Sequence, residues 1–130
     1  MTTIREHNLN FLKIAFNNLL GHEPFNLADI NQQDVEFLAA FRKLVTDFEN
    51  GEDVFDKGEE LLCRAFRAYP HLTHLIARDL LWYFGGSCLH NMPDDEIAKF
   101  QRLDEMRFAA EETDEPFDYL KARASVFEQN

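Results

Sequence analysis

Apolar residues recur at the spacing of an α-helix through nearly the whole chain, and this period constrains the fold more than any other feature. In residues 32–49 a row of apolar side chains falls on one face of a helix, and the row consists of Phe37, Phe41, Leu44, Val45 and Phe48. No stretch shows the sustained apolar–polar alternation of a β-strand. The sequence therefore predicts an all-α protein, a compact bundle of five to six helices.

Residues that cap or break helices divide the chain into the elements of this bundle. The predicted helices cover roughly residues 9–20, 32–49, 53–68, 71–84 and 93–112, and a shorter last helix starts at Pro116. Asn31 is the expected N-cap of the second helix, and Gly51 follows the end of that helix. Gly58 lies on the apolar face of the third helix, which indicates that a neighbouring helix packs closely there.

Length and composition fit one globular domain. The 130 residues predict a single helical domain spanning residues 1–130, long enough to bury one core. The two cysteines, Cys63 and Cys88, are too few for a disulfide framework. Neither a signal peptide nor an apolar run long enough to span a membrane is evident. We therefore expect a cytoplasmic protein with reduced thiols and no membrane association.

The net charge of −11 is concentrated in two regions of the chain. Residues 46–60 carry seven acids against one base, and residues 94–130 carry eleven acids against five bases, so each region has a net charge of −6. Such a surface repels phosphate backbones, so we expect no direct nucleic-acid binding. Solubility is the simplest role for this charge, and attraction of a basic protein partner and mimicry of a nucleic acid are the alternatives.

Asp79 is the least expected residue of the chain, because it lies in an apolar segment. A continuous helix over residues 71–84 would be apolar nearly all round, which predicts a place at the centre of the bundle. A carboxylate buried there needs a partner. We expect a hydrogen bond from another helix's N-terminus, a tyrosine or an arginine. Alternatively, a cavity lined by Asp79, Trp82 and Tyr83 would indicate a ligand-binding or proton-handling carboxylate.

The same helical wheel brings two histidines, one arginine and one tryptophan together on one narrow ridge that is the cationic part of the segment. The members of this ridge are His71, His74, Arg78 and Trp82. In an acidic protein such a ridge favours binding of an anion or of an acidic segment of a partner. Alternatively, the ridge pairs with acids of the same chain, such as those at residues 94–96 or 111–115.

Two pairs of residues have side chains that bind metals. His71 and His74 would share a helix face, and Cys88 and His90 follow the end of that helix. Imidazole and thiolate suit zinc, with iron as a second choice, but about 20 Å of helix separates the two pairs. We expect no cofactor, and zinc or iron is the alternative. Cys88 and His90 could also form a nucleophile pair, but no third residue orients them, so an enzyme is not favoured.

These observations favour a small acidic cytoplasmic protein that acts through protein–protein interaction as an adaptor, regulator or inhibitor. Phe11 and Ile14 lie off the main apolar face of the first helix, so they pack against a second neighbour or form a homodimer contact. A nucleic-acid mimic is one alternative. The other is a metal- or small-ligand-binding protein that uses His71, His74, Asp79, Cys88 and His90.

Overall fold

The structure, a computed structural model, describes residues 3–128 and confirms the all-α class. The described elements are α1 (Ile4–Leu20), α2 (Gln32–Glu49), α3 (Phe55–Ala68), the 3₁₀ helix η1 (Pro70–Leu75), α4 (Arg78–Phe84), the 3₁₀ helix η2 (Gly86–Asn91), α5 (Asp94–Glu112) and α6 (Tyr119–Phe127). The number of segments slightly exceeds the prediction, because short 3₁₀ turns form on both sides of α4. None of the helices described has the length and apolar character needed to cross a membrane.

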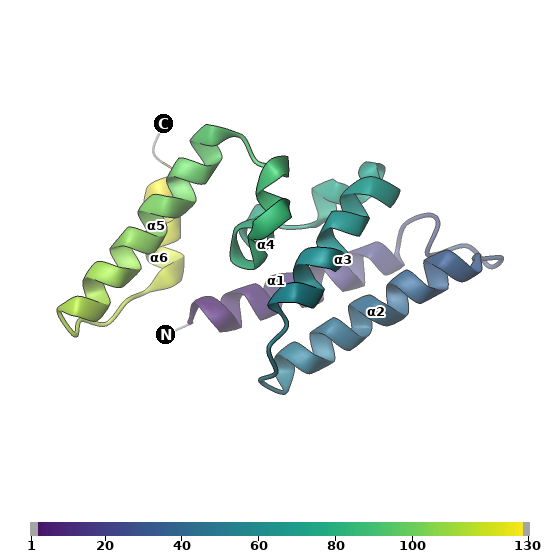
Figure 1. The fold of residues 1–130 in the computed structure, drawn as a ribbon, viewed down its shortest axis with the longest axis horizontal. Helices are drawn as coiled ribbons and strands as arrows, with labels where there is room; N and C mark the ends of the chain where they lie inside the picture. The colour runs from purple at the N-terminus through teal and green to yellow at the C-terminus, as the bar shows by residue number, and fades with distance from the viewer. Residues whose placement is uncertain (1–2, 129–130) are drawn as a thin grey trace.

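The helices form a packed body with a hairpin at one end (Figure 1). Helices α1 and α2 run side by side, and α3 and α4 pack across them. Helices α5 and α6 pack against each other, and α5 also touches α4. The N-terminal end of α1 lies near α6, so the first and last helices of the chain meet at this end (Figure 1).

Helix α2 has the bounds that the sequence predicts. The Asn31 side chain accepts a hydrogen bond from the backbone N–H of Asp34 and so caps the first turn. Gly51 follows the helix with a φ of +80°, a conformation that glycine adopts without strain. Phe37 and Phe41 are fully buried, so the predicted apolar face is the face that enters the core.

The predicted continuous helix over residues 71–84 is wrong. The 3₁₀ helix η1 ends at Leu75, and Ile76 takes an extended backbone conformation with φ −99° and ψ 117° before α4 begins. The hydroxyl of Thr73 donates to the carbonyl of Pro70 at 3.1 Å, a local bond that competes with α-helical pairing. One helical wheel therefore cannot describe both η1 and α4.

The last helix also begins later than predicted, at Tyr119 rather than at Pro116. The Asp118 carboxylate accepts a hydrogen bond from the backbone N–H of Lys121 and caps this helix. The residues between Glu112 and Asp118 form the turn that joins α5 to α6.

Close packing at Gly58 is confirmed. A Cβ atom added to this glycine would lie 2.2 Å from the ring of Phe84, so α3 and α4 approach closely there.

Phe11 and Ile14, the two residues predicted to lie outside the main apolar face of α1, have different surroundings. Phe11 packs near α6, with its ring 5.8 Å from the guanidinium of Arg123, whereas Ile14 is 45% exposed.

Candidate functional site

Asp79 lies at the junction between α4 and the C-terminal hairpin. Its side chain is 1% exposed, and Arg123 donates two hydrogen bonds to the carboxylate, each 2.7 Å long. The hydroxyl of Tyr119 donates a third hydrogen bond at 3.1 Å. The predicted tyrosine or arginine partner is confirmed, and both partners are present on α6.

His7 adds α1 to this cluster. Its Nε2 atom lies 3.4 Å from Oδ2 of Asp79, and its ring packs against the ring of Tyr119. Burial alone would raise the pKa of Asp79, but the hydrogen bonds and positive charge of Arg123, the nearby His7 ring and the Tyr119 hydroxyl outweigh it and lower the pKa to about 2. Burial and the nearby carboxylate raise the pKa of Tyr119. At neutral pH the cluster is therefore an ion pair with an added tyrosine, which suits an anchor better than a proton carrier.

A hollow of about 610 Å³ lies beside this cluster, between α1 and α6. His7 and Arg123 line it together with Phe11 and Phe127, but Asp79, Trp82 and Tyr83 do not. The indole of Trp82 donates to Asp104 at 3.0 Å, and the ring of Tyr83 stacks on Phe48 at a centroid distance of 5.8 Å. The three residues predicted to line one cavity therefore make contacts in different directions.

The break before α4 also divides the predicted cationic ridge. His71 lies 3.2 Å from the carbonyl of Glu23, and the ring of His74 lies 6.4 Å from that of His22. Arg78 donates to Glu96 at 2.8 Å, which confirms pairing with the acids at residues 94–96. His71 and His74 thus face the loop after α1, whereas Arg78 and Trp82 face α5. Their role in partner binding stays a prediction.

The predicted metal-binding pairs lie in different surroundings. Cys88 is fully buried and its Sγ atom lies 3.9 Å from Sγ of Cys63, whereas His90 is exposed. Burial and the neighbouring thiol raise the pKa of Cys88 to about 12, so it carries no free thiolate at neutral pH and is not suited to start a nucleophilic reaction on a substrate. Within residues 3–128, no three side chains of the types His, Cys, Asp and Glu are placed to hold a metal ion.

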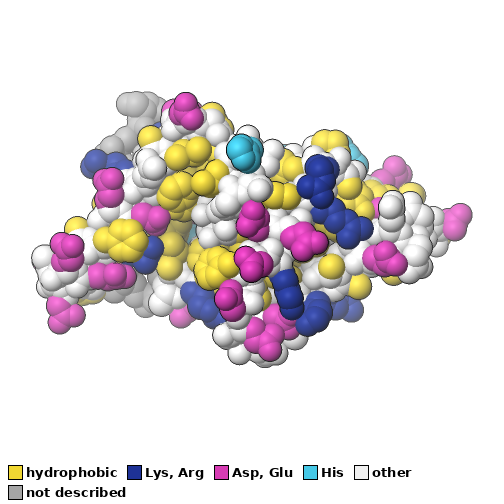
Figure 2. Space-filling view, viewed as in Figure 1, with side chains coloured by type: hydrophobic (Ala, Val, Ile, Leu, Met, Phe, Trp, Pro, Cys, Tyr) yellow, Lys and Arg dark blue, Asp and Glu magenta, His cyan; other side chains and the backbone are white. Residues whose placement is uncertain are grey.

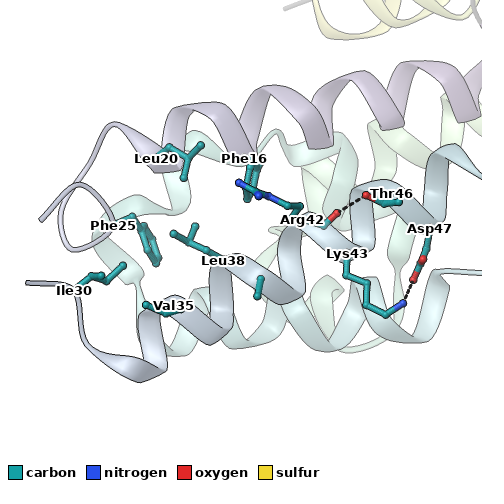
Figure 3. A pocket seen from close by; sticks show the side chains of 11 residues that line it. Phe16, Leu20, Phe25, Ile30, Val35, Leu38, Arg42, Lys43, Thr46 and Asp47 are labelled. Carbon is teal, nitrogen blue, oxygen red and sulfur yellow. Dashed lines mark hydrogen bonds and ion pairs between the residues drawn. The ribbon is translucent and has the colours of Figure 1, made fainter. Parts of the chain in front are cut away.

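A groove of about 700 Å³ lies between α1, α2 and the loop that joins them (Figure 3). We call it the α1–α2 groove. One end is apolar and is lined by Phe16, Leu20, Phe25, Ile30, Val35, Leu38 and Ala39. The other end is polar and is lined by Arg42, Lys43, Thr46 and Asp47. Leu20 and Val35 are 38% and 41% exposed, so the apolar end faces solvent.

Arg42 gives the α1–α2 groove a positive charge in its polar part. Its guanidinium lies over the ring of Phe16 at 5.7 Å, and no carboxylate of residues 3–128 forms an ion pair with it. Lys43, by contrast, is paired with Asp47 at 2.9 Å, and this hydrogen bond lowers the pKa of Asp47. Arg42 is therefore free to meet a carboxylate from outside.

The α1–α2 groove continues toward the C-terminal end of α2. A second hollow of about 310 Å³ shares Phe16, Arg42 and Thr46 with it and extends to Lys13 and Glu49. Residues 35–49 span about 21 Å at the rise of an α-helix. The combined furrow therefore matches about four turns of a second helix in length.

The α1–α2 groove was not predicted from the sequence. Val35, Leu38 and Arg42 follow one another at helical spacing but lie beside the main apolar face of α2. This second, shorter row on α2 is the sequence feature that could have indicated the groove. The loop of residues 21–31 closes the apolar end with Phe25 and Ile30, and nothing in its sequence indicates that position.

Most charged side chains lie outside the α1–α2 groove. On the face shown in Figure 2, acidic side chains lie over α5 and around α3 in the middle of the view, and many basic side chains lie to the right of these acids and toward α2. Glu49, Glu52 and Asp53 belong to the acidic segment of residues 46–60 and lie at or just beyond the C-terminal end of α2. This part of the acidic segment thus adjoins the polar end of the furrow.

Comparison with known families gave one match, a family described as PA2817-like, whose model matches residues 1–130. Neither the curated proteins nor the solved structures gave a match.

Proposed function

The chain belongs to the PA2817-like family, and we propose that it acts by protein–protein interaction, binding an amphipathic helix of a partner protein in the α1–α2 groove. The observation that carries this proposal is the groove itself, an exposed apolar furrow of about 700 Å³ that leads to Arg42, which forms no ion pair with a carboxylate of the described residues. Apolar grooves of this kind bind the apolar face of a helix through residues spaced three and four apart.

The order of side chains along α2 defines the chemistry of the partner helix. Val35 and Leu38 come first, Arg42 follows, and Glu49 stands at the far end. A complementary helix has an apolar face, then a carboxylate opposite Arg42, then basic residues opposite Glu52 and Asp53, because Glu49 is already paired with Lys13 at 3.4 Å. The net charge of −11 also favours a partner that is basic overall.

Binding of this kind fits an adaptor, regulator or inhibitor rather than an enzyme. The groove offers contact area and the charge of Arg42, since Lys43 and Asp47 pair with each other, and its lining includes no histidine or cysteine. We further propose that the protein works in the cytoplasm, where free thiols such as its two cysteines are reduced in the absence of an oxidant.

A photo-crosslinking amino acid placed at position 35 tests the proposal in the cells that produce the protein. We expect a discrete adduct with one partner, and the crosslinked peptide should carry the apolar, acidic and basic residues in the order described above. The matched control carries the same crosslinker at Phe108, which is 50% exposed on α5 and lies outside the α1–α2 groove. That position should give no such adduct.

Two variants make the test specific. Arg42→Glu should remove most of the adduct, because it places like charges opposite each other, and Leu120→Glu on α6 should leave the adduct unchanged. The proposal fails if position 35 gives no adduct, or if Arg42→Glu has no effect. An adduct of the chain with itself would also overturn it, and would identify the groove as a homodimer contact.

A further inference from the structure

We propose that Cys63 and Cys88 form a modification site, a dithiol pair that neutral hydroperoxides oxidise reversibly to an intramolecular disulfide. The pair lies between α3 and η2 and shares no lining residue with the α1–α2 groove, so it does not depend on the proposed function.

The fold brings the two sulfur atoms together from positions 25 residues apart in the sequence. The Sγ atoms lie 3.9 Å apart, which is contact distance, and they must approach to about 2.05 Å to form a disulfide. The thiol of Cys88 donates to the carbonyl of Glu59 at 3.8 Å. Its lone pairs are therefore free to face Cys63.

The two cysteines differ in access to solvent, which assigns them different roles. Cys88 is fully buried, whereas Cys63 is half-buried and lines a surface hollow of about 340 Å³. An oxidant therefore reaches Cys63 first, and Cys88 is placed to react with the product.

The lining of the hollow defines the class of oxidant. The charged side chains around Cys63 are Asp56, Glu59, Glu60 and Arg67, which gives three negative charges against one positive charge. The net negative charge of this hollow repels anionic oxidants, whereas small neutral oxidants can enter it. A hydroperoxide is neutral at physiological pH, which makes it the suitable co-reactant.

The chemistry balances in two steps. The thiolate of Cys63 attacks one peroxide oxygen, so that an S–O bond forms, the O–O bond breaks and the leaving oxygen takes up a proton. The sulfur of Cys88 then attacks the sulfenic sulfur of Cys63, so that an S–S bond forms and the S–O bond breaks. The departing hydroxide combines with the thiol proton of Cys88 to give water. The two thiols lose two electrons, and the peroxide gains them.

Graded additions of hydrogen peroxide to the reduced full-length protein test this site. Intact mass should fall by two hydrogen atoms, and a non-reducing peptide map should show a linkage between Cys63 and Cys88 that dithiothreitol reverses. Because the reaction is intramolecular, its rate constant should stay unchanged when the protein is diluted about tenfold.

Two variants separate the roles of the cysteines. Cys88→Ala should accumulate a sulfenic acid on Cys63 that dimedone traps, whereas Cys63→Ala should leave Cys88 reduced at the same peroxide concentration. Circular dichroism checks that both variants fold. If either variant does not fold, the non-reducing peptide map of the wild-type protein still shows whether Cys63 and Cys88 become linked. A wild-type protein that reaches sulfinic acid on Cys63 without the linkage would overturn the proposal. A linkage that forms only between chains, at a rate that falls on dilution, would overturn it too.

Discussion

The carboxylate of Asp79 stays ionised in the interior because α6 supplies both a cation and a hydroxyl to it. Arg123 meets it with two parallel hydrogen bonds, which is the strongest geometry for an arginine and a carboxylate. Burial of such a pair does not by itself raise stability, because both charges lose water. Removal of one partner, however, leaves the other charge poorly compensated.

We expect Asp79→Asn to lower the free energy of unfolding by about 3 kcal/mol, the lower end of the range for a broken buried pair. The lower end applies because the Arg123 side chain keeps 31% of its exposure and can still reach water. Urea unfolding followed by circular dichroism measures the change. The control is Glu111→Gln, which removes a carboxylate that is 63% exposed and paired with Arg107, and it should change stability by less than about 1 kcal/mol.

The same carboxylate makes stability depend on pH in the acid range. The pKa of Asp79 is lowered to about 2 in the folded protein from the ordinary value of 3.8, so the stabilisation is complete above the unfolded value and is lost as the pH falls through this window. The wild-type protein should therefore lose stability more steeply than Asp79→Asn between about pH 4 and about pH 2. Urea titrations at several pH values measure both slopes, and parallel slopes would contradict the assignment.

At the scale of single helices, sequence patterns correctly predicted features that neighbouring residues determine, such as the bounds of α2. The bounds of α2 follow from the cap at Asn31 and the glycine at position 51, both of which act on neighbouring residues. The break at Ile76 was missed, because apolar periodicity continues through it and no glycine or proline marks it. The burial of Asp79 and the class of its partners were predicted, but His7 was not, since the approach of α1 depends on tertiary packing.

The contact between α3 and α4 yields a prediction at the same scale. Gly58→Ala should be favourable by about 1 kcal/mol in an isolated helix, because alanine is the better helix former. In the protein we expect a net loss of about 1–2 kcal/mol, because the added methyl group would overlap the ring of Phe84. Thermal and urea unfolding measure the loss.

A double-mutant cycle separates the overlap from other effects of this substitution. In a Phe84→Leu background the ring is absent, so Gly58→Ala should be less harmful or even stabilising. An equal loss of stability in both backgrounds would show that contact with Phe84 is not the cause.

At the scale of the whole molecule, the α5–α6 hairpin joins the rest of the fold through apolar packing, such as Phe100 against Trp82, and through a small number of polar contacts. Helix α5 receives hydrogen bonds from Arg78 and Trp82, and α6 is joined to the interior through Asp79. The α1–α2 groove lies on the other helices, so the two parts of the molecule can differ in stability without a change in the groove. Regions with fewer buried contacts open at lower free energy than the rest of a fold.

Asp79→Asn should therefore release the hairpin before it unfolds the remaining helices. When α6 moves away, Arg123 regains water, so local opening relieves the uncompensated charge at a smaller free-energy cost than global unfolding. Amide hydrogen exchange followed by mass spectrometry should show faster exchange in residues 94–127 by about 10- to 100-fold. Residues 32–49 should exchange at nearly the wild-type rate. Gly58→Ala is the matched control, since it weakens the α3–α4 contact, and its faster exchange should centre on those helices. An equal acceleration across all helices in Asp79→Asn would instead mean that the hairpin and the helices of the groove open as a single cooperative unit.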